Sequence, residues 1–239
     1  MEEVNKIDGQ INVEIEQASA EINQTNVLGI ADKKCILQIY QMLYDVDKIF
    51  KLNQIPYWID GGTLLGSLRH GGLIPWDDDA DIDTDIGYAN KIYSLKEEFN
   101  KYGYDIVKHW VGFKIFRIDG AVVKKYNYKY PYLDIFLTRV NRKGQTAFYS
   151  KHASRRDFGN CLFHRSEVYP LKRYKFGEIE LFGPNNPYPY LNKLYGGDWN
   201  NIAYKWYDHK NEKAIKRLRV ELTDEDRKPA EPTGPINKW

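Results

Sequence analysis

Residues 57–86 read YWIDGGTLLGSLRHGGLIPWDDDADIDTDI, and this stretch decides the fold. A short apolar run ends at the pair Gly61-Gly62, and a helical pattern follows from Thr63 to Arg69. Six aspartates then fall within nine positions: Asp77, Asp78, Asp79, Asp81, Asp83 and Asp85. Like charges packed this densely repel one another and resist burial unless a cation neutralises them.

From Asp79 onward the carboxylates alternate with small or apolar residues, which is the period of a β-strand. Asp79, Asp81 and Asp83 should therefore point to one face. Such a row of hard oxygen ligands suits Mg²⁺ or Mn²⁺. The alternatives are an acidic surface turn and a structural calcium loop. The alternation argues against the first, and the absence of EF-hand spacing argues against the second.

The glycine pair predicts a phosphate site. A strand that ends in Gly61-Gly62-Thr63 and opens into a helix exposes backbone N–H groups at the helix N-terminus, where anions bind. Glycine also lets a phosphate approach the backbone closely. A glycine turn alone is weak support, because turns use glycine everywhere. Together with the aspartate strand, it indicates nucleotidyl or phosphoryl transfer.

A second strand pattern, Tyr132–Leu137, is apolar except for Asp134. An unpaired aspartate in a strand core is costly unless it faces a metal or another cation. It could be a third metal ligand, or it could pair with an arginine such as Arg139. Lys114 and Arg117 lie on an earlier strand pattern and could hold a phosphate. We expect each of them to be an ordinary solvent-facing side chain.

The run from Asp60 to Asp81, DGGTLLGSLRHGGLIPWDDDAD, closely resembles the LicD family, which includes phosphocholine transferases and fukutin-related proteins. The match is nearly continuous from Tyr57 to Asp83 and looser over roughly residues 35–200. The resemblance implies an α/β (α+β) nucleotidyltransferase-like fold, with a mixed β-sheet and packed helices. It implies a phosphotransferase that moves a phospho-alcohol, such as phosphocholine or a polyol phosphate, from a CDP-linked donor to a glycan or glycolipid.

The resemblance also assigns roles. Asp79 and Asp81 would hold the catalytic Mg²⁺ (or Mn²⁺), and Asp134 would supply the third carboxylate. The backbone of Gly61, Gly62 and Thr63 would hold a donor phosphate. Arg69 would brace that phosphate or pair with an aspartate. The acceptor proton would go to a carboxylate among Asp77, Asp83 and Asp134.

Two other functions fit part of the pattern. One is a nucleotide-sugar-dependent glycosyltransferase with an Asp-x-Asp metal site; the other is a non-catalytic glycan- or nucleotide-binding member of the fold. The extra Asp78 and the Asp83/Asp85 extension depart from the family pattern and leave open which aspartates bind metal directly. The sequence identifies neither the alcohol nor the acceptor glycan.

Composition excludes several other classes of protein. The chain has 239 residues and a net charge of +2, which argues against a nucleic-acid protein that works through bulk charge. Its two cysteines, Cys35 and Cys161, predict neither a disulfide framework nor a zinc cluster. A secretory leader pattern and an apolar run of transmembrane length are both lacking, so we expect a cytoplasmic protein.

The remaining segments are assigned by pattern. Residues 1–27 are polar, either helical or disordered, and could self-associate; residues 28–221 form the LicD-like domain; residues 222–239 form a charged, Pro-containing tail that we expect to be mobile. Asp45 is placed on the polar side of its helix. His152, His164 and His209 receive no role. The expected elements are helices at 31–53, 88–101 and 190–196, a strand region at 104–118 and a strand or hairpin at 174–182.

Overall fold

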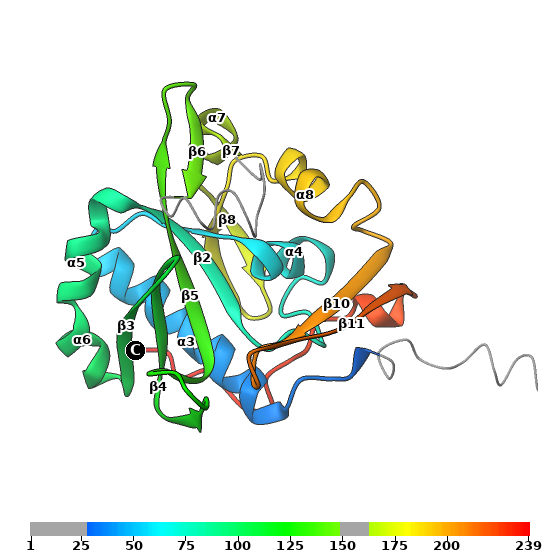
Figure 1. The fold of residues 1–239 in the computed structure, drawn as a ribbon, viewed down its shortest axis with the longest axis horizontal. Helices are drawn as coiled ribbons and strands as arrows, with labels where there is room; N and C mark the ends of the chain where they lie inside the picture. The colour runs from blue at the N-terminus through cyan, green and yellow to red at the C-terminus, as the bar shows by residue number, and fades with distance from the viewer. Residues whose placement is uncertain (1–27, 149–162) are drawn as a thin grey trace, which may run out of the picture.

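The computed structural model describes residues 28–148 and 163–239 and shows a mixed β-sheet with packed helices, as predicted (Figure 1). The sheet order is β1-β2-β5-β4-β3, and β6 and β7 continue it beyond β5. Among the described strands of this sheet, only β2 and β5 run parallel; the other neighbours are antiparallel. The strands are β1 (Trp58–Ile59), β2 (Ala80–Asp85), β3 (Tyr104–His109), β4 (Gly112–Val122), β5 (Lys129–Val140), β6 (Gln145–Phe148) and β7 (Phe163–His164).

Helix α3 (Lys33–Leu52) confirms the predicted amphipathic helix. It begins at Asp32, whose carboxylate accepts hydrogen bonds from two backbone N–H groups of the first turn. Its apolar face packs against β5 and against β9 (Ile179–Gly183), which removes that face from water. The buried residues of this face include Ile36, Ile39, Tyr40, Leu43, Val46 and Phe50.

Two predicted elements are divided in the structure. The helix expected over 88–101 consists of a 3-10 turn, η1 (Ile86–Tyr88), and two short helices, α5 (Ala89–Ser94) and α6 (Lys96–Lys101). The strand region at 104–118 consists of β3 and β4, which form an antiparallel hairpin. The hairpin buries alternate residues of β3 against the core.

The second half of the chain adds two hairpins. The predicted hairpin is confirmed as β8 (Lys172–Phe176) and β9 (Ile179–Gly183). Helices α7 (Arg165–Val168) and α8 (Tyr188–Tyr195) flank it in the chain. A second hairpin, β10 (Ile202–Asp208) and β11 (Lys213–Glu221), was not predicted. Its strands carry many charges, so the apolar residues on its inner side give only a weak strand pattern.

The C-terminal segment, which includes η3 (Glu225–Arg227), is not mobile; that expectation was wrong. Tyr40 Oη donates a hydrogen bond to the carbonyl of Ala230 (3.0 Å). Trp239 stacks on Tyr102 with ring centroids 4.2 Å apart, and its Nε1 donates to Asp45 (2.7 Å). Asp45 is therefore buried, contrary to its predicted place on the polar side of α3.

Some predictions concern residues outside the described ranges. They include the self-association of 1–27 and the assignments for Cys161 and His152. Across the described ranges, no helix is both long and apolar enough to cross a membrane.

Candidate active site

The glycine turn is fastened to strand β2. The N–H of Asp60, after β1, donates to the carbonyl of Asp81 (3.1 Å). Helix α4 (Gly61–Arg69) starts at the next residue, and the hydroxyl of Thr63 accepts a hydrogen bond from Asp81 N–H (2.8 Å). The first turn of α4 therefore lies directly beside the aspartate strand, as the sequence order suggested.

The two glycines leave room for carboxylates. Gly61 has a φ of +50°, a conformation that favours glycine, and a Cβ there would come within 2.7 Å of Asp81 Oδ2. A Cβ on Gly62 would overlap the carboxylate of Asp77. The structure thus gives the pair a packing role against two aspartates, while its role in phosphate binding stays a prediction.

Three carboxylates meet where β2 and β5 run side by side. Asp81 and Asp134 are partners in the parallel register, and Asp79 lies immediately before β2. One oxygen from each of the three lies within 4.8 Å of the others, so together they could hold a metal ion. Oδ1 of Asp134 is buried and has no hydrogen-bond partner, as expected for an oxygen atom that binds a cation.

The electrostatics of this group also fit a cation. Burial raises the pKa of Asp79 to about 8, the nearby Asp77 and Asp78 add to the shift, and His209 opposes it. Burial likewise raises the pKa of Asp81 well above its ordinary value, with Asp79 and Asp134 contributing. Carboxylates held this close need positive charge to stay ionised, and their hard oxygen atoms match Mg²⁺ or Mn²⁺.

Lys114 supplies one such charge, and the expectation that it faces solvent was wrong. It is the register partner of Asp134 on β4, and its Nζ lies 2.7 Å from Asp134 Oδ2 with both side chains buried. Nζ also lies 3.4 Å from the ring centroid of Tyr132. The ion pair considered for Asp134 therefore exists, but with a lysine in place of Arg139. The ammonium of Lys114 contacts Oδ2 of Asp134, so Oδ1 can still bind a metal ion together with Asp79 and Asp81.

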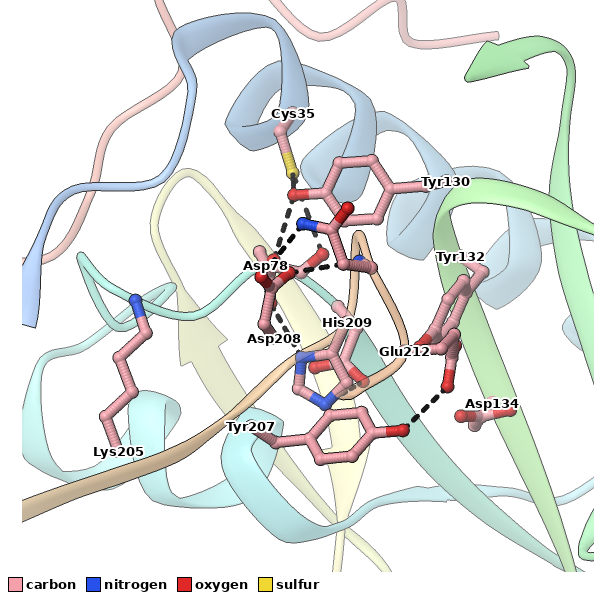
Figure 2. A network of polar contacts seen from close by, with 12 residues as sticks. Cys35, Asp78, Tyr130, Tyr132, Asp134, Lys205, Tyr207, Asp208, His209 and Glu212 are labelled. Carbon is pink, nitrogen blue, oxygen red and sulfur yellow. Dashed lines mark hydrogen bonds and ion pairs between the residues drawn. The ribbon is translucent and has the colours of Figure 1, made fainter. Parts of the chain in front are cut away.

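His209 is a site residue that the sequence did not identify. It lies in the turn between β10 and β11, 131 positions after Asp78 (Figure 2). Its Nδ1 is 2.7 Å from Asp78 Oδ1 and its Nε2 is 3.3 Å from Asp79 Oδ2. Desolvation opposes protonation, but Asp79 and Asp78 raise the pKa of His209 to about 10. It is therefore an imidazolium at neutral pH.

These contacts define a second cluster beside the first. One ligand atom from each member lies within 4.8 Å of the others. Tyr130 also donates a hydrogen bond to Asp78 Oδ2 (3.0 Å). The cluster consists of Asp77, Asp78, Asp79 and His209. Asp79 belongs to both groups, so the protonated His209 partly neutralises the predicted metal site.

Comparison with known proteins identifies the family. The LicD/FKTN/FKRP nucleotidyltransferase domain matches residues 54–186, more than half of the chain. The chain belongs to this family. The matched range contains both the glycine turn and the three carboxylates.

This LicD/FKTN/FKRP family member is also similar to individual proteins, over different lengths of its chain. The uncharacterized protein RP689 of Rickettsia prowazekii is 34% identical over 221 residues, covering 89% of this chain and 76% of the relative. The lipopolysaccharide cholinephosphotransferase LicD of Haemophilus influenzae is 59% identical over 29 residues, 12% of this chain and 11% of that protein. The human ribitol 5-phosphate transferase FKRP is 38% identical over 61 residues, 24% of this chain and 12% of that protein.

Two predicted site residues of this LicD-family chain have other partners. Nη1 of Arg69 donates to the carbonyls of Trp199 (2.6 Å) and Ile202 (3.2 Å), so it holds the segment that leads into β10. Its role as a phosphate ligand stays a prediction. Asp83 is buried beside Asp60, outside the three-carboxylate group, and burial raises its pKa well above the ordinary value.

Proposed function

We propose that this protein transfers a phospho-alcohol from a CDP-linked donor to a hydroxyl of a glycan, with Mg²⁺ or Mn²⁺ held by Asp79, Asp81 and Asp134. One observation carries the proposal. The three carboxylates converge within 4.8 Å from β2 and β5, in a family whose named relatives transfer cholinephosphate or ribitol 5-phosphate. A bound ion would neutralise the donor diphosphate and the charge that develops on the leaving CMP.

The chain itself would hold and orient the reacting groups. Lys114 fixes Asp134 through one oxygen, which leaves the other oxygen free for the ion. The first turn of α4 lies beside Asp81, and the proposal assigns the donor phosphate to the backbone N–H groups of that turn. Such catalysis rests mainly on positioning and on charge neutralisation.

Among the three carboxylates considered as the base, Asp77 fits best. Asp134 is engaged with Lys114, and Asp83 lies buried beside Asp60, outside the three-carboxylate group. Burial raises the pKa of Asp77 to about 6, with His209 opposing the shift. A carboxylate with such a pKa is mostly ionised at pH 7 yet basic enough to accept the acceptor's hydroxyl proton.

The test is a panel of CDP-alcohols (choline, ribitol, glycerol) incubated with the full chain, Mg²⁺ and glycan acceptors. The proposal predicts release of CMP and a glycan that gains the phospho-alcohol mass. Both products should disappear with EDTA and in Asp81→Asn. Release of a nucleoside diphosphate from nucleotide sugars, with sugar added to the acceptor, would replace the proposal with a glycosyltransferase. Absence of turnover with every donor would favour the non-catalytic alternative.

A further inference from the structure

The β10–β11 hairpin lies outside the family's matched range, 54–186, yet its turn reaches the aspartates. Figure 2 shows His209 of this turn directed at Asp78, and the same imidazole contacts Asp79. Glu212 of the same turn accepts hydrogen bonds from Tyr132 (2.6 Å) and Tyr207 (2.9 Å). A ligand that lay along the hairpin would therefore end beside the carboxylate group.

The hairpin has two unlike sides. Its inner side carries Ala203, Leu218 and Val220, which pack against the core. The opposite side carries Tyr204, because its neighbours Ala203 and Lys205 are the register partners of Val220 and Leu218. Trp206 follows at a register irregularity between Lys205 and Tyr207 and is exposed. Arg219 is the register partner of Tyr204 and so shares that side, and it is exposed.

Arg217 joins the two aromatic residues into one surface. Its guanidinium lies 4.2 Å from the ring centroid of Tyr204 and 6.0 Å from that of Trp206. Trp206 is 48% exposed and Arg217 is exposed, so both the ring and the guanidinium are accessible. We call Tyr204, Trp206, Arg217 and Arg219 the outer face of the hairpin.

Among the described residues, the cations of this face form no ion pair. The hairpin has three acidic residues: Asp208 accepts hydrogen bonds from Asn211, Glu212 is bound by the two tyrosines named above, and Glu221 is exposed at the end of β11, two positions from Arg219. Over 28–148 and 163–239, no carboxylate lies within ion-pair distance of the four cations of β11. Those cations are Lys213, Lys216, Arg217 and Arg219.

We propose that the outer face binds an anionic glycan chain and delivers its end to the aspartate group. The proposal rests on the proposed function and names the class of acceptor. Aromatic rings offer flat apolar surfaces for sugar rings, and the guanidinium fork binds phosphate or carboxylate groups in two-point fashion. An acceptor chain along the strands would place a terminal hydroxyl at the turn that holds His209.

A glycan fits this face better than an anionic membrane does. Membrane-surface elements bury an apolar face within the lipid boundary, with their cations around it. Here a guanidinium lies over the ring of Tyr204, and the aliphatic residues Ala203, Leu218 and Val220 face the core. The two strands of the hairpin also run toward the turn that holds His209 beside the aspartate group. A linear ligand bound along the strands would follow the same direction.

The test measures binding of defined polymers to the full-length chain by fluorescence anisotropy. The probes are a phosphorylated dextran, neutral dextran and polyglutamate, with vesicles of phosphatidylglycerol as a fourth arm. The proposal predicts tightest binding to phosphorylated dextran, weakened by added salt because exposed charges are screened. Arg217→Gln/Arg219→Gln should raise its Kd roughly tenfold, since charge-assisted hydrogen bonds are lost. Trp206→Ala should raise the Kd as well.

A matched double variant controls for net charge. Lys91→Gln/Lys143→Gln removes two exposed cations on α5 and the β5–β6 turn, far from the hairpin in Figure 1, and should leave the Kd unchanged. Equal losses in both double variants would overturn the proposal, because binding would then follow bulk charge. Polyglutamate or vesicles binding as tightly as phosphorylated dextran would overturn it too, in favour of a general anion or membrane surface.

Donor titration separates this proposal from the proposed function. Arg217→Gln/Arg219→Gln should leave the affinity for a CDP-alcohol unchanged, and it should raise the KM for an anionic acceptor while leaving kcat nearly constant. If no CDP-alcohol binds, but hairpin-dependent glycan binding persists, the proposed reaction fails and the glycan surface stands. If the donor is turned over and the hairpin variants bind glycan normally, only the surface fails.

Discussion

The ammonium of Lys114 lies 2.7 Å from Oδ2 of Asp134, and the strand register of β4 and β5 places the two residues directly opposite each other. Both side chains are buried, so each charge depends on the other. The same aspartate also faces Asp79 and Asp81. It therefore joins a structural ion pair to the predicted metal site, and both roles can be tested separately.

Removing one member of this pair should be costly. Asp134→Asn leaves the Lys114 ammonium buried without its partner and should lower the free energy of unfolding by about 3–5 kcal/mol in the metal-free protein. Lys114→Met/Asp134→Asn should recover most of that loss, because no charge is left unpaired. Thermal and urea unfolding without Mg²⁺ measure both effects.

The metal role of Asp134 has its own readout. Mg²⁺ should raise the melting temperature of wild type more than that of the double variant, since ion binding to the folded state stabilises it by mass action. An equal Mg²⁺ response in the two proteins would restrict Asp134 to the ion pair.

Asp79→Asn or Asp81→Asn should reduce transfer by at least about two orders of magnitude, the scale of losing one electrostatic stabiliser. The metal-free variants should melt at or above the wild-type temperature, because each removes a carboxylate crowded by others. Product formation and melting curves measure the two effects. Asp85→Asn is the matched control, because its amide can still cap the turn at Gly87. Near-normal Mg²⁺-dependent activity in either site variant would refute the metal assignment.

Gly62→Ala should push on the carboxylate of Asp77, since the added Cβ would overlap it. We expect a loss of roughly 1–3 kcal/mol, as for other overpacked sites, and weaker donor binding. Combining it with Asp77→Ala should restore much of the stability by clearing the space. Gly197→Ala, whose Cβ would meet no atom within 4 Å, is the matched control. Unfolding and donor titration by calorimetry distinguish a spatial conflict from a general effect of losing glycine.

The metal-free protein should lose stability as the pH rises from 7 to 9. The pKa of Asp79 is raised to about 8 and that of His209 to about 10, so in this range the folded protein holds protons that the unfolded chain releases. The unfolded state then binds fewer protons, and the free energy of unfolding falls with pH. Unfolding titrations across this range measure the slope. Asp79→Asn should make it shallower; a slope unchanged in that variant would place its origin elsewhere.

Local patterns were enough to predict several elements. The alternation through residues 79–86 predicted β2, and the helical spacing of apolar residues from Ile36 to Phe50 predicted α3. The pattern also singled out Asp134 as a charged residue inside an apolar strand that needs a partner, and the resemblance to the LicD family grouped it with Asp79 and Asp81. The turn at Gly61-Gly62 was also predicted from the sequence. In the structure it packs against the carboxylates of Asp81 and Asp77.

Other features depended on contacts between distant segments. The extended C-terminal segment contains few apolar residues, yet Trp239 anchors it through Tyr102 and the buried Asp45. No sequence pattern near Trp239 predicts that it contacts Tyr102 and Asp45. A mobile tail was therefore the reasonable but wrong expectation, since composition reports local tendency and carries no information on a docking site elsewhere.

The sequence by itself determined which side chains of β2 and of β5 share a face, because side chains along a strand alternate with a period of two whatever the surroundings. Only the tertiary structure decided the pairings: Asp81 beside Asp134, Lys114 opposite Asp134, and His209 against Asp79. Parallel strands need a long crossover, and a hairpin turn can dock anywhere on the surface, so no local pattern sets such registers. They follow from how the whole chain buries its apolar faces.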